Sequence, residues 1–393
     1  MPWGARLSRR LATVRHLALG ATLGGLLVGC SSNDTFEQPK PLPEIESTVW
    51  LDKVWDTAVG DGHDDQLLFL QPVLSEGELF AVSADGELVS LDPQTGDYNW
   101  ERDLDREILA GVGADSENLY LGTREGALIA LPRSGEGERW AAELPSEILA
   151  PPQSNGSVVV AQTIDGKALA FDVETGEKRW QYDGVIPVLS FRGNATPWVG
   201  PEVTLVAFAS GQLYALLSET GQPLWQYAVG EPAGRTELER LVDVDATPVV
   251  RDGVVYVTGY QGHVAAVDLR SGQEIWRRQA SSFQSPTLDY GNVYISGSNG
   301  VISAYNLFNR QELWVQDSLE WRQTTGLLPV EGYLLTGDFE GYVHILSQLD
   351  GSLQGQEQID EQGLRVPMIR NDDLIYMYGN GGELAAFRLK EAE

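Results

Sequence analysis

A repeated unit runs through most of the 393-residue chain and limits the folds that are open to it. Six segments share one pattern, in which a turn glycine precedes a tryptophan by 14 residues. Self-similarity at a period of about 40 residues is typical of propellers and solenoids. A seventh unit keeps Gly341 but has Gly355 where tryptophan is expected, and an eighth keeps Gly382 without a following tryptophan. The six pairs are Gly86 and Trp100, Gly126 and Trp140, Gly166 and Trp180, Gly211 and Trp225, Gly262 and Trp276, and Gly300 and Trp314.

Each unit has the pattern of antiparallel strands. Apolar and polar residues alternate on both sides of the turn glycine, which is the periodicity of a strand. Dipeptides such as Asp85-Gly86 and Thr95-Gly96 supply the positive φ that tight hairpin turns need. A less regular segment before each unit, such as 246–253, supplies a further strand. Four short strands in each period predict a propeller blade.

The residues ahead of the first repeat complete the last one. The stretch KVWDTAV at 53–59 aligns with PLWQYAV at 223–229, so Trp55 takes the place of Trp225. An N-terminal strand at this position would close the ring and leave no free sheet edge. The sequence therefore predicts an all-β fold over residues 47–393, an eight-bladed β-propeller with four-stranded antiparallel blades, closed by an N-terminal strand.

The recurring tryptophan has two interpretations. It could form an aromatic cage or stack on a cofactor, or it could fill the gap between neighbouring blades. A bulky aromatic at one fixed position of every blade is what packing between successive sheets requires. We therefore interpret the tryptophans as structural.

The first residues have the pattern of a secretory leader. Four arginines and no acidic residue precede the apolar stretch LALGATLGGLLVGC, which ends at Cys30 and is too short to span a membrane. The ending LLVGC resembles the lipobox of bacterial lipoproteins, which implies a signal peptide at 1–29 and an acylated Cys30 carrying diacylglycerol and an N-acyl chain. The alternative is a buried free cysteine in the leader. Ser31 implies sorting to the outer membrane, and the polar, proline-bearing residues up to 46 predict a flexible tether.

Composition excludes several classes of function. The chain has 57 acidic and 27 basic residues, a net charge of −30, which argues against nucleic-acid binding. A single cysteine excludes an internal disulfide and a cysteine-based metal cluster. His63, His263 and His344 lie in different units without ligand spacing, and 61–65 lacks the spacing of a calcium loop. Because no catalytic motif is present either, we expect a protein that is not an enzyme, with no metal and no cofactor.

The repeats resemble those of quinoprotein (PQQ) dehydrogenases, with a shared pattern of G-x-(apolar)-x-A-(apolar)-D-x-x-T/S-G-x-x-x-W. Together with the lipobox, the eight units and the stretch at 243–276, nearly all of residues 20–390 resembles the BamB family. These are propeller lipoproteins of the outer-membrane β-barrel assembly (BAM) complex. The resemblance implies a non-enzymatic scaffold, anchored by lipid to the periplasmic face of the outer membrane, that docks on the POTRA domains of BamA. Nascent β-barrel strands are a further possible partner, by strand addition.

Two connections break the period and are the candidates for function. The intervals between successive tryptophans are 40, 40, 45, 51 and 38 residues, and the long ones contain 184–200 and 230–246. Both run from the outer strand of one blade to the inner strand of the next, so we expect them side by side on one face. The first is apolar around Leu189, and the second suggests a short helix over 235–241. An apolar group ringed by charge is typical of a docking surface.

The family resemblance implies that Leu189, Phe191, Arg192, Asp243 and Asp245 contact BamA. The alternative is that Leu189 and Phe191 fold inward and Arg192 pairs with one of the two aspartates. We favour docking, with internal salt bridges shaping the surface. The rival function is that of a PQQ-dependent dehydrogenase. The resemblance to those enzymes implies a larger propeller with an aspartate base, a calcium ion and, commonly, adjacent cysteines. This chain has a single cysteine and short repeats, so it does not match that pattern.

Overall fold

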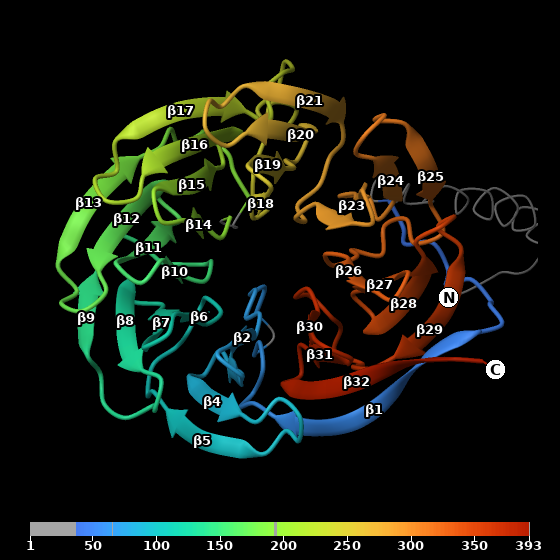
Figure 1. The fold of residues 1–393 in the computed structure, drawn as a ribbon, viewed down its shortest axis with the longest axis horizontal. Helices are drawn as coiled ribbons and strands as arrows, with labels where there is room; N and C mark the ends of the chain where they lie inside the picture. The colour runs from blue at the N-terminus through green and yellow to red at the C-terminus, as the bar shows by residue number, and fades with distance from the viewer. Residues whose placement is uncertain (1–36, 65, 192–194, 393) are drawn as a thin grey trace, which may run out of the picture. The chain divides into compact units, whose positions relative to one another are not determined.

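The computed structural model describes residues 37–64, 66–191 and 195–392. The chain divides into two units, residues 1–38 and 39–393, and every described strand lies in the second (Figure 1). That unit is the predicted eight-bladed propeller, in which eight four-stranded antiparallel sheets are arranged in a ring. The described residues contain strands and no helix, and thus no helical segment that could cross a membrane.

In the first half of the ring, chain order runs from the inner to the outer strand of each blade. Blade 1 consists of β2 (Val73–Ser75), β3 (Glu78–Val82), β4 (Glu87–Leu91) and β5 (Tyr98–Asp103). Blade 2 consists of β6 (Gly113–Ala114), β7 (Asn118–Gly122), β8 (Ala127–Pro132) and β9 (Trp140–Glu143). Blade 3 consists of β10 (Gln153–Ser154), β11 (Val158–Thr163), β12 (Lys167–Asp172) and β13 (Lys178–Asp183). Blade 4 consists of β14 (Trp198–Val199), β15 (Val203–Phe208), β16 (Gln212–Leu217) and β17 (Pro223–Ala228).

The second half keeps this order until the last blade, which takes its outer strand from the N-terminal side. Blade 5 consists of β18 (Val249–Arg251), β19 (Val254–Val257), β20 (His263–Asp268) and β21 (Glu274–Gln279). Blade 6 consists of β22 (Thr287–Asp289), β23 (Asn292–Ser296), β24 (Ile302–Asn306) and β25 (Glu312–Gln316). Blade 7 consists of β26 (Leu328–Val330), β27 (Tyr333–Gly337), β28 (Tyr342–Ser347) and β29 (Leu353–Gln358). Blade 8 consists of β30 (Ile369–Asn371), β31 (Leu374–Tyr378), β32 (Glu383–Glu391) and β1 (Val49–Ala58).

The core lies between the blades. The two middle strands of a blade are buried on both faces by the neighbouring sheets, as in β11 and β12 of blade 3, where the central residues are all buried. The outer strand alternates, so that in β13 the side chain of Trp180 is buried between exposed neighbours. Trp180 lies opposite Ala170 on β12. A small residue on the third strand therefore makes room for the large ring on the fourth.

The tryptophan side chain contacts a turn of the next blade, as predicted for a structural role, and we call this contact the indole clasp. The Trp100 indole donates a hydrogen bond of 3.0 Å to the carbonyl of Arg133, in the turn between β8 and β9 of blade 2. Its ring covers Gly135 in that turn, where an added Cβ would lie 2.7 Å from the ring. Gly135 has a φ of 75°, a conformation that glycine adopts without strain. The same indole-to-carbonyl bond joins Trp55 to Pro93, Trp140 to Val173, Trp180 to Ser218, Trp225 to Leu269, and Trp314 to Gln348.

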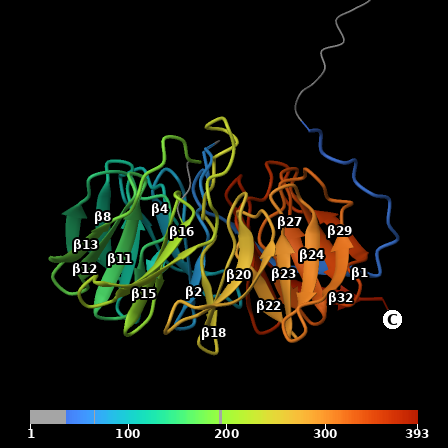
Figure 2. The same cartoon turned by 90° about the horizontal axis from the view of Figure 1, so that it is seen from above.

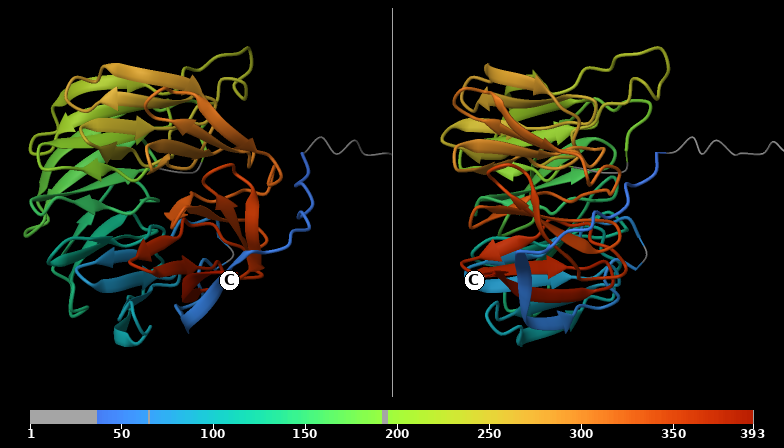
Figure 3. Two further views of the ribbon diagram at one scale, coloured as in Figure 1. Left: turned by 45° about the vertical axis from the view of Figure 1, so that its right-hand side comes forward. Right: turned by 90° about the vertical axis from the view of Figure 1, so that its right-hand side faces the viewer.

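The ring closes through β1, as the sequence predicted (Figure 3). This strand pairs antiparallel with β32 along its length, from Val49 opposite Glu391 to Ala58 opposite Glu383. Trp55 is 8% exposed and lies opposite Ala386, the position that tryptophan takes in the other blades. Its indole bond to Pro93 joins the last blade to the first.

The absence of the tryptophan from blade 7 has a physical explanation. Gly355 lies opposite Ile345, so the large side chain has moved to the third strand. The carbonyl of Val49 fills the space beside Gly355, where an added Cβ would lie 2.1 Å from this oxygen. The amide of Thr48 donates 2.8 Å to the carbonyl of Gln354. The chain that enters β1 therefore occupies the place of the missing tryptophan.

Part of the segment predicted as a tether contacts the propeller. The Lys40 amide donates to the carbonyl of Glu320, and its ammonium lies 3.0 Å from the Asp317 carboxylate and 3.2 Å from that of Glu320. The buried guanidinium of Arg322 donates to the Lys40 carbonyl at 3.2 Å and pairs with Asp338 at 2.7 Å. Residue 40 is thus held on the loop between blades 6 and 7.

Candidate functional site

The two long connections meet on one face of the propeller, as their position in the repeat predicted. One joins β13 to β14 and the other joins β17 to β18. The amide of Phe191, in the first, donates a hydrogen bond of 3.2 Å to the carboxylate of Asp243, in the second. Figure 2 shows the segment between β17 and β18 rising above the blades. The sequence therefore located two neighbouring loops correctly.

Phe191 belongs to a cluster of three aromatic rings. Its ring meets Tyr260 edge-on at a centroid distance of 4.9 Å and Phe283 edge-on at 5.0 Å. Tyr260 and Phe283 stack on each other at 4.8 Å with an interplanar angle of 10°. Tyr260 lies in the turn between β19 and β20, and Phe283 in the connection from β21 to β22. Such contacts between aromatic rings fix the position of the Phe191 segment on blade 5.

The residues before Phe191 remain at the surface. Val188 is 89% exposed, Ile186 58%, Leu189 44% and Phe191 37%. The apolar segment is therefore partly anchored through one ring and otherwise open. A preorganised apolar strip of this kind is typical of a protein-binding surface.

The two aspartates lie deeper than a surface contact requires. Asp243 is buried, and its carbonyl accepts a 2.8 Å hydrogen bond from the amide of Tyr260. Burial and the neighbouring Asp245 raise the pKa of Asp243 above its usual range, and burial raises the pKa of Asp245. Arg192, their predicted partner, lies outside the described residues. The described contacts of Asp243 position the loops, since they hold Phe191 and Tyr260 together.

The helix predicted over 235–241 is wrong. The segment forms one turn, in which the amide of Arg240 donates to the carbonyl of Thr236. A capping box closes it, because the Thr236 hydroxyl accepts from the Glu239 amide and the Glu239 carboxylate accepts from the Thr236 amide. Leu241 is buried directly after this turn, so the chain returns to the propeller before a second turn can form.

The three histidines considered as metal ligands lie apart from one another in the structure. His63 is buried and bonded to Asn380, His263 lies against the Val229 carbonyl, and His344 is buried against Asp338. Within the described ranges, no three histidine, cysteine or acidic side chains gather where they could hold a metal ion.

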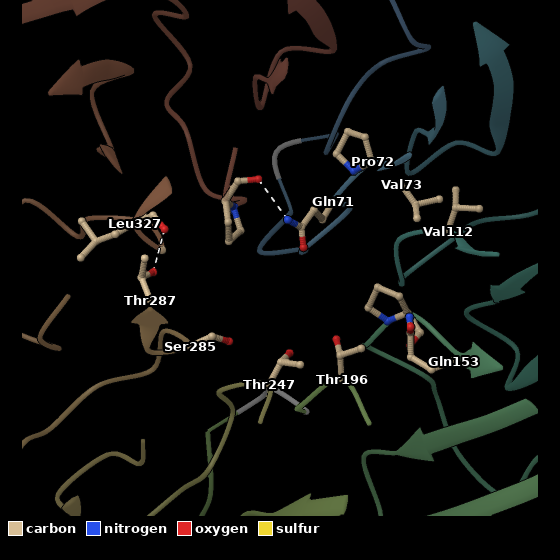
Figure 4. A pocket seen from close by; sticks show the side chains of 13 residues that line it. Gln71, Pro72, Val73, Val112, Gln153, Thr196, Thr247, Ser285, Thr287 and Leu327 are labelled. Atoms are coloured by element: carbon tan, nitrogen blue, oxygen red, sulfur yellow. Dashed lines mark hydrogen bonds between the residues drawn. The ribbon is translucent and has the colours of Figure 1, made fainter. Parts of the chain in front are cut away.

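All eight blades contribute residues to the wall of the central channel (Figure 4). Its cavity of about 350 Å³ has prolines on one part of its wall and hydroxyl side chains on another. The Gln71 amide donates to the carbonyl of Pro367 across the junction of blades 1 and 8. One lining residue from each blade, in blade order, is Gln71, Val112, Pro151, Thr196, Thr247, Ser285, Gly326 and Pro367.

Tyr260 and Phe283 were not predicted from the sequence. A signal for them existed, because both are aromatic residues away from the tryptophan position of the repeat. Tyr260 comes two residues before Gly262, and Phe283 directly precedes the irregular segment 284–291. The repeat alone does not say that their rings meet above the β13–β14 connection.

The fold and this site define a class of protein: an eight-bladed propeller of tryptophan-bearing repeats with a candidate protein-binding surface on one face. Residues 84–316 match the family model described as outer membrane protein assembly factor BamB. The chain is 51% identical to the outer membrane protein assembly factor BamB of Marinobacter adhaerens over 378 residues, which cover 96% of this chain and 97% of that one. It therefore belongs to the BamB family of outer membrane protein assembly factors.

Solved structures show the same relationship. The crystal structure of BamB from Moraxella catarrhalis is similar with a TM-score of 0.79 at 28% identity, covering 86% of this chain and all of that one. A europium-containing methanol dehydrogenase reaches a TM-score of 0.70 at 13% identity, covering 86% of this chain and 93% of that one. At so low an identity, the second likeness extends to the fold alone.

Proposed function

We propose that this protein is a non-enzymatic scaffold of the BAM complex that docks on the POTRA domains of BamA and supports insertion of β-barrel proteins into the outer membrane. Membership of a family of outer membrane protein assembly factors supports the general role. The observation that carries the docking surface is the Phe191 segment. Its ring and amide are fixed by Tyr260, Phe283 and Asp243, and its apolar neighbours are left exposed.

The proposal assigns different roles to the predicted residues. Leu189 and Phe191 present apolar surface to the partner, and the exposed Val188 extends it. Asp243 and Asp245 lie beneath this apolar surface and contribute by positioning the two loops. Arg192, which lies outside the described residues, remains the proposed cationic contact with BamA. Binding energy is then concentrated in a few apolar anchors, as at most protein interfaces.

Co-purification with BamA tests the docking surface. We expect Val188→Asp and Phe191→Ala each to reduce recovery of BamA at least tenfold, because they remove or charge the apolar contact. Phe308→Ala is the matched control, since Phe308 is 95% exposed in the turn between β24 and β25. Full recovery with both loop variants, in a protein that unfolds at the wild-type temperature, would show that this surface is not the docking site.

We propose that Cys30, which lies outside the described residues, carries the lipid anchor. The acyl chains on Cys30 are then the only non-protein groups that the scaffold needs, and they hold it at the periplasmic face of the outer membrane. Two or more acyl chains give stable membrane attachment. Cys30→Ser should move the protein from the outer-membrane fraction to the soluble periplasmic fraction and abolish labelling by radioactive palmitate.

A further inference from the structure

A wide funnel opens onto the central channel. Its volume is about 960 Å³, and it shares Gln71, Pro151 and Ser285 with the wall of the channel cavity. It also shares Phe191 and Asp245 with the candidate docking site. The funnel therefore lies on the loop-bearing face, next to the surface proposed to bind BamA. Cavities of 300–1,000 Å³ are typical of ligand sites, so this one can take a segment of a few residues.

The funnel is almost free of charge in a strongly acidic protein. The chain carries 57 acidic residues, yet Asp245 and Arg365 are the only ionisable side chains among the described residues that line the funnel. Burial raises the pKa of Asp245, so a charge on this carboxyl is less favourable here than at the surface. The Arg365 guanidinium donates a 2.7 Å hydrogen bond to the carbonyl of Gln66. A charged ligand would find little here to compensate for the loss of its water.

Carboxamide side chains and apolar rings share the wall. Gln284, Gln323 and Gln362 line the funnel, and their side chains make no hydrogen bond to any residue that the structure describes. A carboxamide offers both a donor and an acceptor, which is what an unpaired peptide group needs. Phe283 and Phe339 also line the funnel and supply apolar surface.

We propose that the funnel binds a short, uncharged and apolar segment of an unfolded polypeptide, such as one strand of a β-barrel protein before its insertion. This inference rests on the proposed function. The apolar side chains of the segment would meet the phenylalanines, and its free backbone groups would bond to the carboxamides. Strands of membrane barrels alternate apolar and polar residues, which suits a wall of mixed character.

The test uses the full acylated protein in lipid nanodiscs and a dye-labelled peptide of ten residues that alternates valine and serine. Fluorescence anisotropy reports binding. Gln284→Glu and Gln323→Glu keep the side-chain shape but add a charge, so we expect each to weaken binding about tenfold. Gln94→Glu is the matched control, because Gln94 is exposed in the turn between β4 and β5, away from the funnel. A peptide with aspartate in place of serine should bind at least tenfold more weakly.

Three results would overturn the inference. They are a wild-type protein that does not bind the neutral peptide, funnel variants that bind it as well as the Gln94→Glu control, and funnel variants that lose BamA while keeping the peptide. The last would show that the partner itself fills the funnel. Retained recovery of BamA in Gln284→Glu, with loss of the peptide, supports the inference. Failure of the docking proposal is seen separately, in the Val188→Asp and Phe191→Ala variants.

Discussion

The closing strand makes a quantitative prediction about stability. Trp55 lies on β1, is 8% exposed, and reaches across to the carbonyl of Pro93 in blade 1 at 3.1 Å. Trp50 lies on the same strand and is 44% exposed. Replacement of each tryptophan by phenylalanine removes the same atoms from the same strand. Only at Trp55 do those atoms join the last blade to the first.

We expect Trp55→Phe to lower the free energy of unfolding by about 2 kcal/mol. Loss of the indole hydrogen bond contributes about 1 kcal/mol, because the Pro93 carbonyl keeps a second donor in the Tyr376 hydroxyl at 3.1 Å and is not left unpaired. The smaller ring buries less apolar area and leaves a small cavity, which adds about another 1 kcal/mol. Trp50→Phe should cost less than about 0.5 kcal/mol, as is usual for exposed sites.

Urea unfolding followed by far-ultraviolet circular dichroism measures both variants without relying on tryptophan fluorescence. Equal losses at Trp50 and Trp55 would refute the reasoning that the indole clasp closes the ring. Deletion of residues 48–58 is the larger form of the same test. It uncovers the edge of β32, so the protein should aggregate or lose thermal stability, and full stability would contradict the closure.

Two further predictions concern buried and tethered groups. Burial lowers the pKa of His63 to about 4, whereas the unfolded chain takes up this proton near its usual pKa of 6.5. The contribution of neutral His63 is therefore complete above pH 6.5 and is lost as pH falls toward 4, up to about 3 kcal/mol. His63→Gln should flatten the pH dependence of urea unfolding in that window, and an unchanged slope would count against it. Asp317→Asn removes one ion pair of Lys40, so amide hydrogen exchange across 38–48 should become severalfold faster. The wild-type protein in 1 M salt should show the same acceleration, because salt screens the ion pair. Identical exchange rates in the variant and the wild type would mean that backbone hydrogen bonds alone hold the segment.

The sequence was sufficient to predict the fold because each blade repeats one local rule. Glycine turns, strand alternation and the tryptophan spacing all indicate the same four-stranded unit, and Trp55 identifies the strand that completes the ring. The repeat did not explain why blade 7 lacks its tryptophan. Gly355 replaces tryptophan because Val49, the first residue of β1, packs on blade 7, and the two residues are about 300 positions apart in the chain.

The candidate site was predictable in position but not in detail. Loop length alone indicated 184–200 and 230–246 as neighbours. The buried Asp243 bonds through its carbonyl to the amide of Tyr260, which belongs to a different turn. The single turn at 236–240 depends on the burial of Leu241. Both are set by tertiary contacts that local sequence patterns do not carry.

The clasp also explains why the candidate site and the funnel lie on one face. The turn between the third and fourth strands of a blade holds the glycine and the carbonyl that the preceding blade's tryptophan contacts, as at Gly96 and Pro93. Its length and conformation are therefore fixed by packing. The connections between blades lie on the opposite face, where the indole bonds described above do not reach them, so they can lengthen without opening the ring. Blade 6 supports this argument, because Arg310 replaces the clasp glycine there and the exposed Phe308 appears in the same turn. The two long connections that form the candidate site both lie on the face opposite to these turns.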